Sequence, residues 1–225
     1  MNGLPLRRDR DLVARHQLID TARELTRRGL RKTTAGNLSV RAGEGLLLTP
    51  SGMQSGDLTP RDLPFMDLDG NWEGPLKPSS EWRFHRDILA NRPEVGAVIH
   101  THAPFCTTLA CHQRGIPAFH YMVGVAGGTD IRCAPYATFG TPELCQAALQ
   151  ALDGRKACLL AHHGMIALGK DLKSALKLTI EVEELAEQYW RCLQLGDPPL
   201  LSDAEMSRVL DRFTTYGQTQ AAEVG

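Results

Sequence analysis

The sequence predicts one αβ domain in which helices pack against a mixed β-sheet, and three observations support this prediction. The chain has 225 residues, which suits one sizeable domain. No serine- or glycine-rich linker, no block of like charges and no internal repeat divides it. Helical and strand-like patterns alternate irregularly, which does not fit a regular parallel βαβ repeat. We therefore expect a single domain that spans residues 1–225.

Composition and charge exclude several classes of function. Hydrophobic residues make up 42% of the chain and charged residues 23%, as in ordinary globular proteins. The formal net charge of −1 gives no electrostatic basis for binding nucleic acid or an anionic membrane surface. No apolar stretch is long enough to span a bilayer, and residues 1–18 lack the apolar core of a secretory signal. The six cysteines form no C-x-x-C pair, so we expect reduced thiols in a cytoplasmic protein.

The first third of the chain predicts a helix followed by short strands. Residues 8–28 form the helix, because Leu18, Ala22 and Leu25 recur at helical spacing, and Gly29 ends it. Apolar runs separated by turns then predict three strands, at residues 38–41, 45–50 and 63–70, the last with an Asp-Gly turn signal.

The middle of the chain predicts two helices and a strand between them. The first helix covers residues 78–90, where Ser79 or Ser80 is the expected N-cap. The strand covers residues 96–102, an apolar run that ends in two histidines. The second helix runs from residue 103 and closes on Gly115.

The last third predicts three helices and one strand. Thr141 is the expected N-cap of the first helix, with Pro142 at its first position. Ser202 and Glu205 predict a capping box at the start of the last helix. The first helix is expected over residues 141–152. An apolar strand that ends in histidine is expected over residues 157–164, and a long helix over residues 171–195.

Histidines follow two of the predicted strands. Residues i and i+2 of a strand point to the same side, so His100 and His102 can converge on one metal ion. An isolated H-x-H is more often two polar residues leaving a sheet, but a second strand also ends in histidine, at His162 and His163. Adjacent residues point to opposite sides, so we expect one of these two to join the site, and the spacing does not decide which.

A carboxylate and several anion-binding positions complete the predicted site. Three histidines leave one ligand position open, as in a catalytic metal site, and Glu81 is the candidate base or fourth ligand. Plain helix capping would also account for Glu81 and its two serine neighbours, although a helix start attracts anions as well. The turns Gly36-Asn37 and Ser51-Gly52 fit an anion site or ordinary turn chemistry. Two other classes of metal-dependent hydrolase do not fit. Metallo-β-lactamase-like hydrolases carry an H-x-H-x-D-H pattern, which HTHAPF lacks, and the chain is short for an amidohydrolase (β/α)₈ barrel.

Several strings, taken in order, resemble the class II aldolase/adducin family over nearly the whole chain. They are AGNLSVR, TPSG, PSSEWRFH, HTHA, HYMVGVAGG, CAPYATFGT, AHHG and TTYG. The resemblance implies a single domain with helices on both faces of a largely antiparallel central sheet. It also implies a zinc-dependent homotetramer whose active sites lie between subunits.

The resemblance assigns roles to individual residues. Zinc would be bound by His100, His102 and His163, with Glu81 as a ligand in the resting enzyme and as the catalytic base. The phosphate-binding positions are Gly36, Asn37, Ser51, Gly52, Ser79 and Ser80. Tyr121 matches a catalytic tyrosine from the neighbouring subunit, and Phe139 and Tyr216 match positions on the aldehyde side. The other histidines, which are His16, His85, His112, His120 and His162, are expected to be structural or at the surface. The ligand set also accepts Mn²⁺ or Co²⁺.

The activity implied is the reversible cleavage of a ketose 1-phosphate, such as L-fuculose 1-phosphate, to dihydroxyacetone phosphate and an aldehyde such as L-lactaldehyde. One alternative is an aldolase or dehydratase acting on 5-deoxyribulose or 5-methylthioribulose 1-phosphate. Another is a 4-epimerase of L-ribulose 5-phosphate, which Glu81 disfavours because such epimerases usually carry aspartate there. The third alternative is a non-enzymatic, adducin-like interaction module, which would lack the metal ligands.

Overall fold

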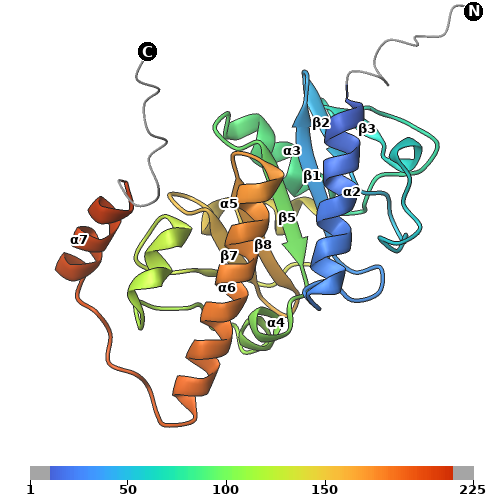
Figure 1. Cartoon of the computed structure of the whole chain (residues 1–225). Coiled ribbons are helices and arrows are strands. Elements are labelled where there is room, and N and C mark those ends of the chain that lie inside the picture. The colour runs from blue at the N-terminus through green and yellow to red at the C-terminus, as the bar shows by residue number, and fades with distance from the viewer. Residues whose placement is uncertain (1–10, 215–225) are drawn as a thin grey trace, which may run out of the picture.

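A computed structural model describes residues 11–214 and shows one central β-sheet between two layers of helices (Figure 1). Over these residues the sheet has eight strands in the order β4-β3-β2-β1-β5-β8-β7-β6. All neighbouring strands pair antiparallel except β6 and β7, which are parallel. The largely antiparallel sheet is therefore confirmed. The strands are β1 Asn37–Ala42, β2 Gly45–Leu48, β3 Phe65–Asp67, β4 Trp72–Glu73, β5 Ala97–Thr101, β6 Cys133–Ala134, β7 Ala157–Leu160 and β8 Gly164–Gly169.

Alternating side chains along the strands separate the two layers. Ala97 and Ile99 of β5 pack into the core under α2, α4 and α6, whereas Val98 packs into the core under α3 and α5. His100 follows Val98 by two residues and therefore faces α3. The helices are α2 Leu12–Arg27, α3 Trp82–Asn91, α4 Pro104–Cys111, α5 Pro142–Ala151, α6 Leu172–Leu193 and α7 Asp203–Phe213, with the 3₁₀ helices η1 Pro60–Asp62 and η2 Tyr121–Ala126.

Several predicted helix ends are confirmed by their hydrogen bonds. Gly29, just beyond α2, has the positive φ of 75° typical of a residue that terminates a helix. The Thr141 hydroxyl accepts a hydrogen bond from the Leu144 N–H at 3.3 Å, with Pro142 at the first position of α5. Ser202 caps α7 by accepting from the Glu205 N–H at 3.2 Å. The predicted capping box is only half formed, because the Glu205 carboxylate accepts from Arg208 instead. The helix predicted to close on Gly115 instead ends at Cys111.

The second predicted helix begins later than expected. Glu81 is the N-cap residue of α3, which starts at Trp82, so the prediction that Ser79 or Ser80 caps the helix is wrong. The Ser79 N–H donates to the carbonyl of Thr49 at 3.1 Å instead. This contact links the segment before α3 to the residue that follows β2, so the two serines lie beside the end of that strand.

The predicted strand over residues 157–164 is really the first half of a hairpin. β7 ends at Leu160, the chain reverses, and β8 begins at Gly164 and pairs antiparallel with β7. His162 takes a φ of 55°, because so tight a reversal needs a residue in the left-handed region. The sequence prediction missed β8, whose apolar run continues directly from the turn. None of the helices in residues 11–214 is long and apolar enough to cross a membrane.

Candidate active site

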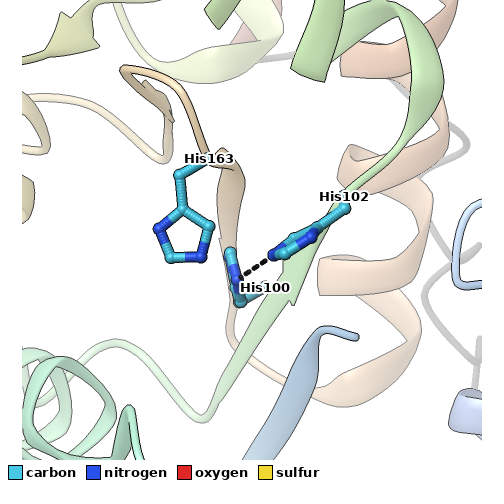
Figure 2. Close-up of side chains that lie close together, drawn as sticks. All are labelled: His100, His102 and His163. Atoms are coloured by element: carbon cyan, nitrogen blue, oxygen red, sulfur yellow. Dashed lines mark hydrogen bonds between the residues drawn. The ribbon is translucent and has the colours of Figure 1, made fainter. Parts of the chain in front are cut away.

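Three histidines meet beyond the adjacent ends of β5 and β8 (Figure 2). His100 is the fourth residue of β5, His102 follows that strand, and His163 directly precedes β8. Their ligand nitrogens all lie within 4.8 Å of one another, and the Nε2 atoms of His100 and His102 are 3.1 Å apart. The predicted convergence of two strand ends is thus observed, and the tertiary structure selects His163 over His162.

The protonation of these rings suits metal binding. His100 is fully buried, and its Nδ1–H donates to the Met165 carbonyl at 2.8 Å, which leaves the Nε2 lone pair facing the other histidines. Burial and the neighbouring His100 lower the pKa of His163 to about 4. The same two causes lower the pKa of His102 to about 4, although that ring is more exposed. At neutral pH the His102 and His163 rings are therefore uncharged, which is the form that ligates metals.

Glu81 places a carboxylate against the three imidazoles. Its Oε2 accepts a hydrogen bond from the Asn37 side-chain amide at 2.8 Å and lies 3.3 Å from His100 Nε2. Its Oε1 lies 3.2 Å from His163 Nε2. Burial by itself would raise the pKa of Glu81, but His100, His163 and the Asn37 amide outweigh it and lower the pKa below its usual range.

The donor set fits a bound divalent cation. Within residues 11–214, Glu81 Oε1 is buried without a hydrogen-bond donor. The neutral imidazoles of His102 and His163 present lone pairs to a site that also holds this carboxylate, and a positive ion among these atoms would offset their mutual repulsion. Three nitrogens and one carboxylate oxygen are ligands that zinc and similar metals accept, so His100, His102, His163 and Glu81 could hold such an ion.

A buried hydrogen-bond chain holds Glu81 in place from behind. His85 is fully buried and its pKa is lowered to about 3, so the ring is neutral. Its Nε2–H donates to the Asn37 Oδ1 at 2.5 Å, and its Nδ1 accepts from the Ser39 hydroxyl at 2.7 Å. This fixes the orientation of the Asn37 amide, so that its N–H group faces Glu81.

Sequence patterns did not reveal this hydrogen-bond chain, because His85 was expected to be structural or at the surface. Two spacings could have indicated it. Glu81 and His85 are four residues apart and so lie on one side of the start of α3, and Asn37 and Ser39 are two apart on one face of β1. Pairing of Asn37 with His100 across β1 and β5 brings these faces together.

A cavity of about 420 Å³ opens beside the histidines. All six predicted phosphate-binding positions line it, together with Glu81, His102, His163 and Phe139. Six further residues that were not expected at the site also line the cavity: Thr34, Ala35, Pro50, Tyr136, Ala137 and His162. Gly36 is required at its position, because a Cβ there would lie 2.7 Å from the His100 carbonyl oxygen and its φ is 80°.

The remaining predicted site residues fall in three different situations. Phe139 lines the cavity and is 66% exposed. Tyr121, on η2, is 51% exposed, stacks beside Phe213 and is not among the residues that line this cavity. Its role in a neighbouring subunit's site stays a prediction. Tyr216 lies outside the described residues.

The fold and the three-histidine site with its buried carboxylate are those of a protein that could hold a metal ion beside a cavity of substrate size. The chain belongs to the class II aldolase and adducin family, because residues 16–190 match the model described as Class II Aldolase and Adducin N-terminal domain. It is a class II aldolase, a carbon–carbon lyase. The non-enzymatic alternative is therefore wrong for this chain.

Relatives with stated activities cover nearly the whole chain. The chain is 68% identical over 206 residues to the 5-methylthioribulose-1-phosphate/5-deoxyribulose-1-phosphate aldolase of Rhodospirillum rubrum, covering 92% of this chain and 93% of the relative. It is 50% identical over 210 residues to the L-fuculose phosphate aldolase of Escherichia coli, covering 93% and 97%. A solved structure of an L-fuculose 1-phosphate aldolase superposes with a TM-score of 0.86 at 39% identity, covering 89% of this chain and 95% of that one.

Proposed function

We propose that this aldolase cleaves a 5-deoxy or 5-methylthio ketopentose 1-phosphate into dihydroxyacetone phosphate and a two-carbon aldehyde. The 68% identity to the Rhodospirillum rubrum aldolase carries this proposal. The sequence analysis placed this substrate class second to L-fuculose 1-phosphate. The order is reversed here because the relative named for the latter substrate is less similar, at 50% identity.

The proposed metal ligands are His100, His102, His163 and Glu81, and the proposed ion is Zn²⁺. When bound, such an ion supplies Lewis-acid stabilisation of the negative charge that cleavage leaves on the three-carbon fragment. The chain's own contribution is the fixed arrangement of these side chains. His100 is held by the Met165 carbonyl, and Glu81 is held by Asn37.

Glu81 is the proposed acid and base for the three-carbon fragment. In cleavage the C4 hydroxyl loses its proton, the C3–C4 bond breaks and the C4 oxygen becomes the aldehyde carbonyl. The C4 hydroxyl proton leaves to solvent by way of Tyr121, as proposed below. The electron pair of the broken bond stays on the three-carbon fragment until C3 receives a proton from Glu81, which takes that proton from solvent, so one proton is lost and one gained. In condensation the Glu81 carboxylate removes that same proton. Asn37 donates to Oε2, which leaves Oε1 as the oxygen available to carry the proton.

The phosphate is proposed to bind where two turns and the segment before α3 meet. Ser51 and Gly52 follow β2, Ser79 and Ser80 precede α3, and all four line the cavity with hydroxyl and backbone donors. Binding energy from this remote group would fix the reacting carbons against Glu81.

The aldehyde end of the substrate is proposed to lie beside Tyr136, Ala137 and Phe139. A methyl or methylthio group suits these apolar and aromatic surfaces, because sulfur and aromatic rings attract each other weakly. L-Fuculose 1-phosphate remains a second candidate, favoured by the Escherichia coli relative and by His162. The His162 ring lines the same cavity and offers a hydrogen bond to the extra hydroxyl of that substrate.

A panel of substrates tests the assignment. Release of dihydroxyacetone phosphate is measured from 5-deoxyribulose, 5-methylthioribulose and L-fuculose 1-phosphates, with L-ribulose 5-phosphate as the epimerase control. We expect kcat/KM to be about tenfold or more higher for a 5-substituted ketopentose, the scale on which an apolar pocket discriminates. A preference for L-fuculose 1-phosphate would reverse the two candidates. Consumption of substrate without dihydroxyacetone phosphate would indicate dehydration or epimerisation instead.

Tyr121 is proposed to exchange the proton of the C4 hydroxyl, which becomes the aldehyde oxygen, in the site of a neighbouring subunit of a homotetramer. Its exposure on η2, away from its own cavity, supports this proposal. We expect Tyr121→Phe and Glu81→Gln to be nearly inactive alone but to recover activity when co-expressed, because some mixed sites hold both intact residues. The control is co-expression of either variant with the double variant, which cannot rebuild a site. Equal, low activity in both mixtures would place Tyr121 outside the shared site.

A further inference from the structure

The proposed phosphate site lacks a cation of its own. A phosphate monoester carries a charge of about −1.5 to −2 at neutral pH. Among the described residues that line the cavity there is no lysine or arginine, and the donors at the phosphate end are serines, glycines and Asn37. Neutral donors can bind a phosphate, but they leave most of its charge unbalanced in a partly enclosed site.

Arg31 lies directly behind this end of the cavity. Its side chain is 2% exposed and belongs to the segment between α2 and β1. Nη2 donates to the Met53 carbonyl at 3.1 Å, and Nε makes a long contact of 3.5 Å with the Gly36 carbonyl. Gly36, and Gly52 next to Met53, both line the cavity, so the guanidinium backs the two turns that are proposed to bind phosphate.

The charge of Arg31 is not balanced by the described part of the chain. Its Nη1 is buried and has no hydrogen-bond partner there, and no carboxylate of residues 11–214 forms a salt bridge with it. Burial lowers the pKa of this arginine, but arginine remains charged at neutral pH. A buried cation without a counter-ion destabilises a fold, so its presence here calls for an anion that completes the site.

We propose that Arg31 supplies the counter-charge for the substrate phosphate from behind the Gly36 and Met53 turns. This inference rests on the proposed phosphate site. Arg31 is then a positioning residue that acts through the field of its guanidinium and through the two carbonyls that it contacts. The bound phosphate in turn offsets the cost of burying the arginine. The competing explanation is structural: Arg31 would only hold the two turns together through these hydrogen bonds.

The two explanations differ in the protein without phosphate. Hydrogen bonds that only hold the two turns together stabilise the fold with or without phosphate. Their removal should therefore lower the melting temperature of the phosphate-free protein. A counter-charge stabilises only the phosphate complex, so Arg31→Gln should leave the phosphate-free melting temperature unchanged or raise it. Arg31→Lys keeps the positive charge but loses the planar guanidinium and its fixed donor geometry. This variant therefore separates the effect of the charge from the effect of the hydrogen bonds.

The experiment uses the metal-loaded full-length protein with inorganic phosphate as the probe, and binding is measured by titration calorimetry. We expect Arg31→Gln to weaken phosphate binding at least tenfold, or about 1.4 kcal/mol. We expect Arg31→Lys to stay within about threefold of the parent protein, because it keeps the charge. The matched control is Arg28→Gln, which lies three residues before Arg31 and removes an exposed arginine that pairs with Glu24. Its effect should stay below about twofold, because exposed charges are screened.

Proton exchange gives a second readout that a fold defect would not imitate. With dihydroxyacetone phosphate in heavy water, Arg31→Gln should raise KM about tenfold and leave kcat unchanged. With dihydroxyacetone, which has no phosphate, the variant and the parent should exchange at the same rate.

The outcomes separate the proposals. Unchanged phosphate binding in Arg31→Gln would overturn the inference. A lower melting temperature without phosphate, together with weak binding that Arg31→Lys does not restore, would also overturn it in favour of the structural explanation. If the parent protein itself bound no phosphate, the proposed phosphate site would fail and this inference with it. If phosphate bound the parent and the variant equally, that site would stand and only the role of Arg31 would fall.

Discussion

Replacing His102 with alanine is expected to remove the bound metal and the activity while the chain stays folded. His102 follows β5 and its ring is exposed, whereas His100 is fully buried and hydrogen-bonded to Met165. Truncation at position 102 therefore removes one of three histidine ligands without opening a cavity in the core. Only three of the four candidate ligands, His100, His163 and Glu81, then remain. Metal affinity should fall by more than about a hundredfold, because loss of even an outer-shell partner of a ligand costs about 10- to 100-fold.

The measurement combines metal analysis of the purified variant, circular dichroism and aldol cleavage. The matched control is His112→Ala, which removes an exposed histidine ten residues away, just beyond α4. We expect the control to retain metal, activity and melting temperature. Near-parental metal content in His102→Ala would contradict the assignment of the three-histidine site.

Replacing Glu81 with glutamine is expected to stop proton abstraction while the phosphate site is kept. A glutamine fits the same space and can still accept the hydrogen bond that Asn37 now donates to Glu81 at 2.8 Å. Its amide is not basic at neutral pH, so exchange of the hydroxymethyl proton of dihydroxyacetone phosphate should slow greatly. Loss of a general base costs about a hundredfold to ten-thousandfold in rate, or roughly 3–5 kcal/mol of activation free energy.

Deuterium exchange into dihydroxyacetone phosphate, without any aldehyde, measures this step alone. Metal content must be matched before the comparison, because a neutral ligand in place of a charged one weakens metal binding. Glu44→Gln, at an exposed turn between β1 and β2, serves as the control and should exchange like the parent. If metal-loaded Glu81→Gln exchanged as fast as the parent, Glu81 would be a ligand or a helix cap only, and the base would have to be sought elsewhere.

Local patterns in the sequence were sufficient for the elements whose causes lie within a few residues. Gly29 and Thr141 identify helix ends because the terminating φ and the capping hydroxyl act over two or three positions. The same holds for the pair His100 and His102, since strand geometry alone puts them on one side. Boundaries were less certain where a distant contact decided them, as at Ser79, whose N–H is bound by Thr49.

Strand periodicity left open which of two adjacent histidines faces the candidate metal site; the family resemblance favoured His163, and the tertiary structure brings that residue to His100 and His102. A strand prediction over 157–164 cannot include the hairpin, because the reversal at His162 is stabilised by pairing between β7 and β8. The same limit hid the role of His85. Its spacing from Glu81 is local, but its partners Asn37 and Ser39 come from a strand more than forty residues away.

The sequence by itself determined the chemistry available to this protein: the imidazoles at strand ends, the carboxylate at a helix start, and the small residues at turns. The structure determined how these groups are combined. Sheet register sets Asn37 opposite His100, and burial leaves Arg31 without a carboxylate partner in the described part of the chain. Periodicity reports only which side a residue faces within its own element. The identity of its neighbour depends on packing between segments that are far apart in the chain, and this packing is fixed only when the whole domain has folded.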